Sequence, residues 1–226
     1  MGSPSDLKPI KVYGKGSPNP TKVAIILEEL GLPHEIEPVP YSDVKKPEYL
    51  AINPNGRLPS IRDPNTGLTL WESGAILEYL VDKYDTDHKL SFPAGSNEDY
   101  LAKQWFFFQT TGQGPYYGQA AWFTTYHHEK LPSAIDRYIN EIKRVTGVIE
   151  GHLARQKEEH GAKEGFDGPW LVGNKLSYVD IAFVPWQVIA KRLFGEPGQY
   201  NEDDYPHVKE WLGKLLARES VRKALE

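Results

Sequence analysis

Two polar residues stand at the turn that leads into the first expected helix. Ser17 and Asn19 lie in the segment 16–23, where apolar residues begin to recur at helical spacing. A helix N-terminus carries partial positive charge, and an amide side chain can donate a hydrogen bond to sulfur, so this turn could stabilise a thiolate. A structural role is the alternative, because Asn at the N-cap and Pro20 at the first helical position suit a helix start.

A second segment, 53–59, could expose main-chain hydrogen-bonding groups. It carries Arg57, Leu58 and Pro59 between a loop and an expected strand. A cis peptide bond before Pro59 would turn the amide and carbonyl of Leu58 outward, where a bound peptide could pair with them as an added strand. An ordinary turn with proline at the strand start remains the alternative.

The third segment, 71–76, suits the recognition of an amino-acid head group. We expect Ser73 to cap a helix that begins at Gly74, whose free N–H groups favour a carboxylate. Glu72 could hold the neighbouring ammonium group. Simple N-capping, worth about 1 kcal/mol, is the alternative. Taken together, the three segments match the parts of glutathione, which has an amino-acid head, a peptide centre bearing a thiol, and a terminal carboxylate.

The order of expected elements indicates two domains. Strands are expected at 9–13 and 34–39, helices at 20–30 and 73–84, and a hairpin from 58–62 and 68–71. Later helical patterns cover 98–125, 131–160, 177–191, 206–217 and 219–225. We therefore predict a mixed α/β domain over 1–86, a linker over 87–98 and an all-helical domain over 99–226. Ser177 and Asp180 have capping-box spacing and should stabilise one of these helices without doing chemistry.

Composition excludes several classes of function. The 226 residues include no cysteine, which rules out disulfides, thiolate metal sites and a cysteine nucleophile. A net charge of -5 gives no general attraction to nucleic acid or to an anionic membrane. Because the first residues lack an apolar core and no apolar run approaches the roughly 20 residues that span a bilayer, we expect a cytoplasmic protein. His127 and His128 are adjacent, but a metal site would need further ligands, so no metal is expected.

Beyond these patterns, the sequence resembles glutathione transferases over nearly its whole length. The most specific marks are Arg57-Leu58-Pro59 followed by Trp71-Glu72-Ser73, and the capping box at Ser177. Other matching segments are SPN at 17–19, KVA at 22–24, WESGAIL at 71–77, FFQTTG at 107–112, GQA at 118–120, AIDRY at 134–138 and AFVPW at 182–186. They resemble the subgroup that holds the yeast nitrogen regulator and the bacterial nu-class disulfide reductases. The resemblance implies a thioredoxin-like domain followed by an all-α domain, and a homodimer.

The resemblance also implies a role for each matching residue. Asn19, with Ser17, would face the glutathione sulfur, and Leu58 beside Pro59 would pair with the cysteinyl backbone. The γ-glutamyl end would be held by Glu72 and Ser73, and the glycyl end would lie near Arg57. Arg137 would help to hold a second glutathione.

Two departures from the family pattern affect this assignment. Pro20 replaces a usual glycine and removes one N–H from the helix start. Val44 stands where relatives often carry a polar residue for the glycyl carboxylate, a part that Lys45 or Lys46 could take over.

The resulting hypothesis is an enzyme that uses a bound glutathione thiolate against disulfides or small electrophiles. Tyr116 and Tyr117 follow an expected kink over 112–115 and are candidates for the electrophile pocket, expected between the domains. The alternative is a glutathione-binding regulatory protein without significant turnover. Glutathione would serve as co-substrate, and neither nucleic acid nor membrane is expected as a partner.

Overall fold

The computed structural model describes residues 7–195 and 199–226, which form two compact units. The first unit groups Met1–Ser91 with Arg218–Glu226, and the second unit is Phe92–Ala217. The predicted domain boundaries at 86 and 99 stay a prediction, as does the absence of a signal peptide, which concerns residues 1–6 outside the described part of the chain. Within the described residues, no helix is long and apolar enough to cross a membrane.

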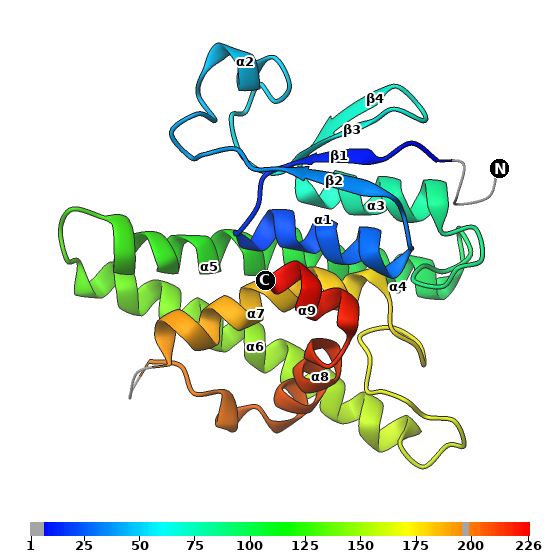
Figure 1. Ribbon diagram of the computed structural model, residues 1–226. Coiled ribbons are helices and arrows are strands. Elements are labelled where there is room, and N and C mark those ends of the chain that lie inside the picture. The colour runs from blue at the N-terminus through cyan, green and yellow to red at the C-terminus, as the bar shows by residue number, and fades with distance from the viewer. Residues whose placement is uncertain (1–6, 196–198) are drawn as a thin grey trace. The chain divides into compact units, whose positions relative to one another are not determined.

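The first unit is built on a four-stranded sheet with the strand order β2-β1-β3-β4 (Figure 1). Its strands are β1 (Ile10–Tyr13), β2 (His34–Glu37), β3 (Ser60–Asp63) and β4 (Leu68–Trp71). Strand β1 pairs parallel to β2 and antiparallel to β3, and β3 pairs antiparallel to β4. The predicted hairpin is thereby confirmed, with the turn between β3 and β4.

Helices α1 (Pro18–Glu29) and α3 (Ser73–Tyr84) pack side by side on one face of this sheet, and α2 (Pro47–Leu50) is a single short turn (Figure 1). Ile10 and Val12 of β1 and Ile61 of β3 are 0–1 % exposed, because alternate strand residues point to the helix-covered face. The residues Val23–Leu27 of α1 are buried in an unbroken run. Five consecutive buried residues point to every side of a helix, so this part of α1 is covered by its neighbours on every side.

Helix α9 (Glu219–Leu225) belongs to the first unit by its contacts, since it packs on α1. The contact is centred on Glu29, whose side chain is 4 % exposed. Its carboxylate accepts hydrogen bonds from Arg218 Nε at 2.6 Å, from Arg218 Nη2 at 2.8 Å and from the Ser220 hydroxyl. The last nine residues are therefore tied to the end of the first helix through one buried acid.

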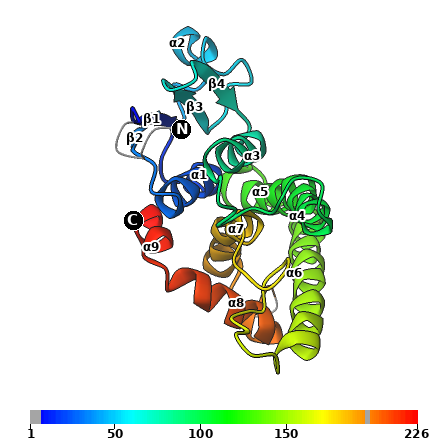
Figure 2. The same cartoon turned by 90° about the vertical axis from the view of Figure 1, so that its right-hand side faces the viewer.

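In the described residues of the second unit, the regular elements are all helical and are joined by loops (Figure 2). Its elements are α4 (Asn97–Phe108), the π-helical segments η2 (Gln109–Gln113) and η3 (Trp122–Tyr126), α5 (Gly114–Ala121), α6 (Pro132–His160), α7 (Tyr178–Phe194), the 3₁₀ turn η4 (Glu202–Asp204) and α8 (Pro206–Leu216). The segment 112–115, the site of the predicted kink, spans the end of η2 and the start of α5, and Pro115 there lacks the N–H for a regular helical bond.

The predicted capping box is confirmed at the start of α7. Asp180 is fully buried and accepts four hydrogen bonds, from Ser177 N at 3.0 Å, Ser177 Oγ at 2.9 Å, Leu171 N at 2.9 Å and Trp211 Nε1 at 2.9 Å. The aspartate therefore links a loop, the start of α7 and helix α8, which is a wider role than capping alone.

Glu29 makes the stability of the first unit dependent on pH. Burial alone would raise the pKa of Glu29, but the hydrogen bonds from Arg218 and Ser220 outweigh it and hold the pKa below its usual value. The stabilisation is therefore complete above the unfolded value of about 4.3 and is lost as the pH falls through the lower folded pKa.

We expect Glu29→Gln to lower the free energy of unfolding by about 1–3 kcal/mol at pH 7. The difference from the wild type should shrink steadily between pH 5 and pH 3, and denaturant titrations at each pH would measure it. Glu35→Gln, at an exposed position of β2, is the matched control. A difference that stays constant down to pH 3 would contradict this assignment.

Candidate functional site

Three loops of the first unit meet through three specific contacts. The side chain of Leu58 lies against Gly14, where an added Cβ would come within 3.1 Å of Leu58 Cβ. Asn55 Nδ2 donates to Glu72 Oε1 at 3.4 Å, and Lys22 Nζ donates to Ser73 Oγ at 3.5 Å. The structure therefore brings together the β1–α1 turn, the α2–β3 loop and the start of α3, which carry the three segments singled out in the sequence.

Helix α1 begins earlier than the sequence suggested. Ser17 is the N-cap, with φ −135° and ψ 158°, and Pro18 is the first helical residue. The expected N-cap position of Asn19 is wrong, because Pro18 has the φ that suits the first helical position and the helix starts there. Asn19 instead lies partly exposed in the first turn, beside N–H groups that have no partner within the helix. Pro20, in the same turn, supplies no N–H.

Of the two alternatives for the 53–59 segment, the structure has the cis peptide bond, between Leu58 and Pro59. The main-chain carbonyl before it is held rigidly, since Arg57 O accepts from Tyr49 Oη at 2.8 Å and from Asn53 Nδ2 at 2.7 Å. In the part of the chain that the structure describes, no hydrogen bond reaches the main-chain N–H or C=O of Leu58. Those two groups are available to a ligand with a peptide backbone.

The start of α3 also lies one residue earlier than expected. The helix begins at Ser73, and Glu72 is the N-cap residue, so the predicted capping role of Ser73 is wrong. Glu72 has φ 69°, a positive value that side-chain-bearing residues rarely adopt. The exposed carboxylate of Glu72 and the buried Ser73 hydroxyl lie at a helix N-terminus, where free N–H groups favour an anion.

Sequence reasoning missed Lys22 as a residue of this site. It is 2 % exposed, and burial lowers its pKa to about 7 although the Glu72 carboxylate opposes the shift. The sequence did contain a signal: Lys22 directly precedes the apolar run of α1. A lysine next to such a run can be buried together with it.

The two lysines considered for the glycyl end have different surroundings. Lys45 Nζ donates to Asn55 O at 2.8 Å and so reaches the loop that carries Arg57, whereas Lys46 pairs with Asp43 at 2.7 Å. Val44 is 8 % exposed and packs in an apolar cluster with Tyr13 and Tyr49. The exposed Arg57 on this loop and Lys45, which reaches it, thus bring two cations to the loop.

Comparison with known proteins agrees with this geometry. The family models for the N-terminal and C-terminal domains of glutathione S-transferase match residues 16–83 and 115–219. The glutathione S-transferase-like protein tpcF of Aspergillus fumigatus is 63% identical, over 97% of this chain and 96% of its own length. The chain belongs to the glutathione transferase family.

Two solved structures place this transferase in the fungal Ure2p-like subgroup and confirm its fold. The transferase URE2P6 of Phanerochaete chrysosporium, in complex with oxidized glutathione, has a TM-score of 0.85 at 46% identity, covering 96% of this chain and 94% of its own. A homologue from Lodderomyces elongisporus with two GSH per subunit has a TM-score of 0.88 at 38% identity, covering 97% and 98%. A thioredoxin-like domain followed by a helical domain is the glutathione transferase architecture.

The second unit of this transferase carries the other predicted residues, Tyr116, Tyr117 and Arg137. Tyr117 is completely buried, and its hydroxyl bonds with Thr146 Oγ1 at 2.9 Å and with Gln187 Oε1 at 2.8 Å. The expectation that Tyr117 lines an electrophile pocket is therefore replaced by a packing role in the helical bundle. The phenol group fills a polar gap between α5, α6 and α7.

Tyr116 and Arg137 lie nearer the surface. The Arg137 guanidinium carbon is 5.7 Å from the centre of the Tyr116 ring, and Arg137 Nη1 pairs with Glu141 at 2.5 Å. A guanidinium over an aromatic face can bind a further carboxylate while keeping these contacts, because it has five N–H donors.

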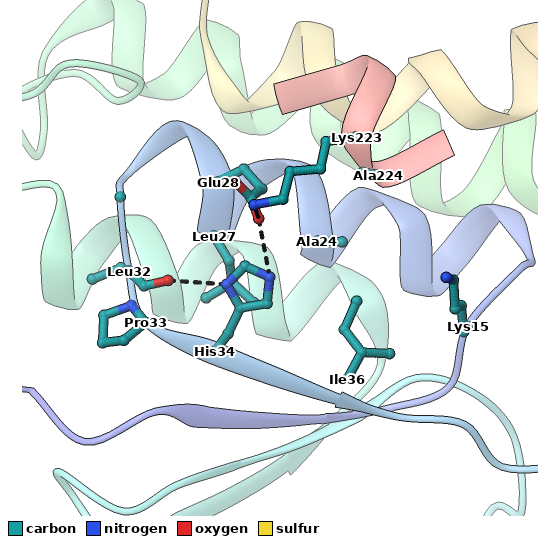
Figure 3. Close-up of a pocket in the computed structure, with 11 residues that line it drawn as sticks. Lys15, Ala24, Leu27, Glu28, Leu32, Pro33, His34, Ile36, Lys223 and Ala224 are labelled. Atoms are coloured by element: carbon teal, nitrogen blue, oxygen red, sulfur yellow. Dashed lines mark hydrogen bonds and ion pairs between the residues drawn. The ribbon is translucent and has the colours of Figure 1, made fainter. Parts of the chain in front are cut away.

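A cavity of about 770 Å³ lies elsewhere in the first unit, between α1, β2 and α9 (Figure 3). Glu28 accepts from Lys223 at 2.7 Å and lies 3.4 Å from His34 at one end, and Lys15 lines the other. None of the residues predicted to hold glutathione is among the described residues that line it. The cavity is therefore separate from the three-loop site.

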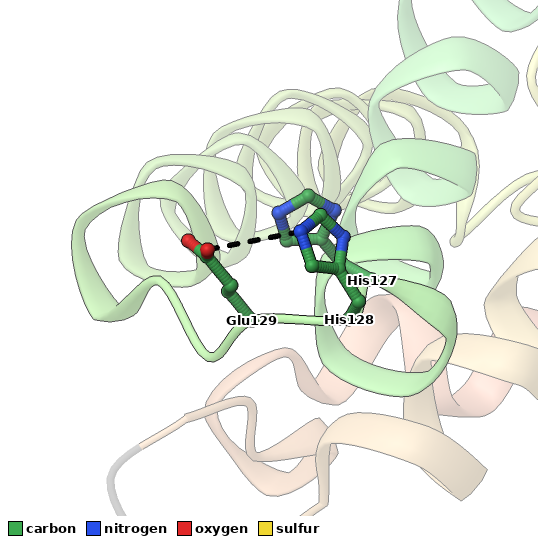
Figure 4. Close-up of side chains that lie close together, drawn as sticks. All are labelled: His127, His128 and Glu129. Atoms are coloured by element: carbon green, nitrogen blue, oxygen red, sulfur yellow. Dashed lines mark ion pairs between the residues drawn. The ribbon is translucent and has the colours of Figure 1, made fainter.

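His127, His128 and Glu129 form the one His/Asp/Glu group in the described residues whose potential ligand atoms converge, within 4.8 Å of one another (Figure 4). His128 Nε2 lies 3.7 Å from Glu129 Oε1, and both side chains are mostly exposed. These three consecutive residues offer three ligands, whereas a structural zinc site takes four. The group is therefore one ligand short of a structural zinc site.

The backbone of Glu72 generates a prediction about stability. A positive φ costs a residue with a side chain of the order of 1–3 kcal/mol, and glycine avoids that cost while losing about 0.5–1 kcal/mol of conformational entropy. Both Glu72→Gly and Glu72→Ala remove the carboxylate, so their difference isolates the backbone. We expect Glu72→Gly to be more stable than Glu72→Ala by about 1 kcal/mol in thermal unfolding. Equal melting temperatures would limit the strain of the positive φ to the roughly 0.5–1 kcal/mol that glycine loses in conformational entropy.

Proposed function

We propose that the three-loop site binds glutathione and presents its thiolate to disulfides or small electrophiles. The observation that carries this proposal is the unpaired main chain of Leu58 between a helix start with Asn19 and a helix start with Glu72 and Ser73. A γ-linked tripeptide with a central thiol needs those three features in that order.

Each part of glutathione has a matching group in the proposed arrangement. The amide and carbonyl of the cysteinyl residue pair with Leu58, and the γ-glutamyl carboxylate and ammonium contact Ser73 and Glu72. Arg57 and Lys45 lie nearest the glycyl carboxylate. The sulfur faces Asn19 and Ser17 at the start of α1.

The site needs to lower the pKa of the glutathione thiol only moderately. A free thiol of this kind has a pKa near 8.5, and lowering it by about two units stabilises the thiolate by roughly 2.7 kcal/mol relative to the thiol. A charge-assisted hydrogen bond contributes about 1.5–3 kcal/mol, and the helix N-terminus adds about 0.3–1 kcal/mol. The start of α1 and the Asn19 amide are sufficient together, and no general base is required.

For disulfides, the absence of cysteine dictates how the reaction runs. The glutathione thiolate attacks one sulfur of the substrate disulfide, a mixed disulfide with glutathione forms, and the other sulfur leaves as a thiolate. A second glutathione thiolate then attacks the mixed disulfide, so that oxidised glutathione and a second thiol are released. We propose that Arg137, beside Tyr116, binds this second glutathione through a carboxylate.

The binding step has a direct test. Glutathione binds only the folded protein in this scheme, so it should raise the melting temperature with a concentration dependence that follows its dissociation constant. An unchanged melting temperature at millimolar glutathione would refute the proposed site.

Light scattering on the same samples would test the homodimer that the family resemblance implies.

The sulfur contact predicts a specific pattern of kinetics. Asn19→Ala should lower kcat/KM by about ten- to a hundredfold, because it removes one hydrogen bond to the thiolate, while glutathione affinity changes less. Asn19→Asp, which keeps the shape of the side chain but repels a thiolate, should lose at least as much. Full activity of Asn19→Asp would remove the residue from the sulfur's surroundings.

The disulfide branch predicts acceleration of thiol exchange without a protein thiol. With glutathione as donor, the wild type should reduce a small symmetrical disulfide faster than the uncatalysed exchange, and alkylating pretreatment followed by removal of the reagent should change nothing. Arg137→Ala should slow this reaction, whereas Arg155→Ala, elsewhere on α6, should not. No acceleration would leave conjugation as the reaction, and an unaffected Arg137→Ala would exclude that residue.

A further inference from the structure

Lys22 is a buried cation placed directly beneath the start of α3. The side chain extends from the second turn of α1, a helix that packs against α3, and its Nζ donates to Ser73 Oγ at 3.5 Å. Ser73 is itself 9 % exposed and is the first residue of α3. The lysine therefore lies behind the hydroxyl that faces the proposed γ-glutamyl carboxylate.

A lysine in this position is costly to charge. Burial of a lysine side chain is unfavourable for its charged form, since an ammonium group loses its hydration there. Burial accordingly lowers the pKa of Lys22 to about 7, against the opposing attraction of the Glu72 carboxylate. Near neutral pH, the free protein thus holds Lys22 in a mixture of neutral and charged forms.

Glu72 and the two acids at the end of α1 have partners of their own. Glu72 is exposed and accepts from Asn55 Nδ2 at 3.4 Å. On the side of α1 that meets α9, Glu28 pairs with Lys223 at 2.7 Å and Glu29 pairs with Arg218 at 2.6 Å. Both acids lie at least six residues further along the helix than Lys22, or about 9 Å at 1.5 Å per residue. A carboxylate arriving at Ser73 would become the dominant new charge for Lys22.

We propose that Lys22 is a positioning residue for glutathione, the internal counter-cation of its γ-glutamyl carboxylate, and that it acts through the Ser73 hydroxyl. This inference rests on the proposed glutathione site and concerns the electrostatics of that site. A hydroxyl that accepts from Lys22 has its own hydrogen free to donate to the ligand. Ammonium, hydroxyl and carboxylate then form a polarised chain in which each hydrogen bond strengthens the next.

The arrangement couples glutathione binding to proton uptake. An opposite charge within a few ångströms raises the pKa of a lysine by about 1–3 units, so Lys22 takes up a proton when the carboxylate arrives. The ligand ammonium pairs with the exposed Glu72, further from Lys22 than the group on Ser73. Affinity is therefore highest below pH 7 and falls as the pH rises through the range between the free and the bound pKa.

The test must remove the proton of the glutathione thiol, whose ionisation on binding would release a proton and mask the uptake. S-hexylglutathione has no titratable sulfur and is a suitable probe. Calorimetric titration at pH 8 in phosphate and in Tris, which differ in ionisation enthalpy, measures the protons exchanged. For the wild type we expect uptake of roughly 0.4–0.9 proton and an affinity that falls about six- to twenty-five-fold from pH 6.5 to pH 8.5.

Lys22→Met is the decisive variant, because methionine fills similar space without a charge and should leave the protein at least as stable. Its proton uptake should fall nearly to zero, its affinity should vary little with pH, and at pH 6.5 it should bind at least about eightfold more weakly than the wild type. Lys8→Met, the same change at an exposed lysine of the first unit, should behave as the wild type. The ammonium of the ligand adds the same small uptake to every variant.

The outcomes separate the two proposals. Binding of S-hexylglutathione by the wild type without proton uptake, or uptake that persists in Lys22→Met, would overturn the role of Lys22 and leave the glutathione site standing. A wild type that fails to bind the probe at any pH would overturn both. Loss of stability in Lys22→Met with unchanged proton uptake would show that the lysine is structural only.

Discussion

Helix α1 is buried along nearly its whole length, and the first unit is arranged around that burial. Its first turn carries Asn19, its second turn carries Lys22, and its last turn ends in Glu29, which α9 holds through Arg218 and Ser220. A helix covered by the sheet, by α3 and by α9 cannot shift without exposing apolar area, at roughly 25 cal/mol per Å². The groups at its start that we propose to contact glutathione are therefore held in place as well.

The rigidity extends to the loops that meet α1. Leu58 packs against Gly14 so closely that a Cβ at position 14 would lie 3.1 Å from Leu58 Cβ, and the Arg57 carbonyl accepts hydrogen bonds from Tyr49 and Asn53. The groups that we propose to contact glutathione are thus the main-chain atoms of Leu58, on a loop fixed by these contacts, and side chains at the starts of α1 and α3. Such preorganisation lowers the entropy that binding must offset.

Local charge, not the net charge, sets what this site attracts. The chain as a whole carries −5, which opposes an anionic tripeptide. Two helix N-termini, Lys45 and Arg57 supply positive potential at the surface of the site, and Lys22 supplies it from within. The departure at Val44 is consistent with this picture, because the valine joins the apolar cluster with Tyr13 and the adjacent Lys45 reaches the ligand-facing loop.

The sequence by itself determined the elements of this protein and most of the chemistry available to it. Periodicity located the strands and helices, the Ser177 spacing indicated the capping box, and the lack of cysteine excluded a protein thiol. The motif around Pro59 left a cis bond and an ordinary turn as alternatives. Local patterns carry this information because helices, strands and caps are determined by residues a few positions apart. The helix starts at Ser17 and Glu72 were misplaced by one or two residues, since several neighbouring residues could serve as caps.

Only the tertiary structure decided which of these groups act together. Lys22 meets Ser73 across 51 residues of sequence, Leu58 meets Gly14, and Glu29 meets Arg218 across 189 residues. The same is true of Tyr117, whose hydroxyl is satisfied by Thr146 and Gln187 from two other helices, so that a residue expected to face a ligand is part of a core. Burial depends on the packing of elements distant in sequence, and burial is what turns an ordinary lysine into one with a pKa near neutrality.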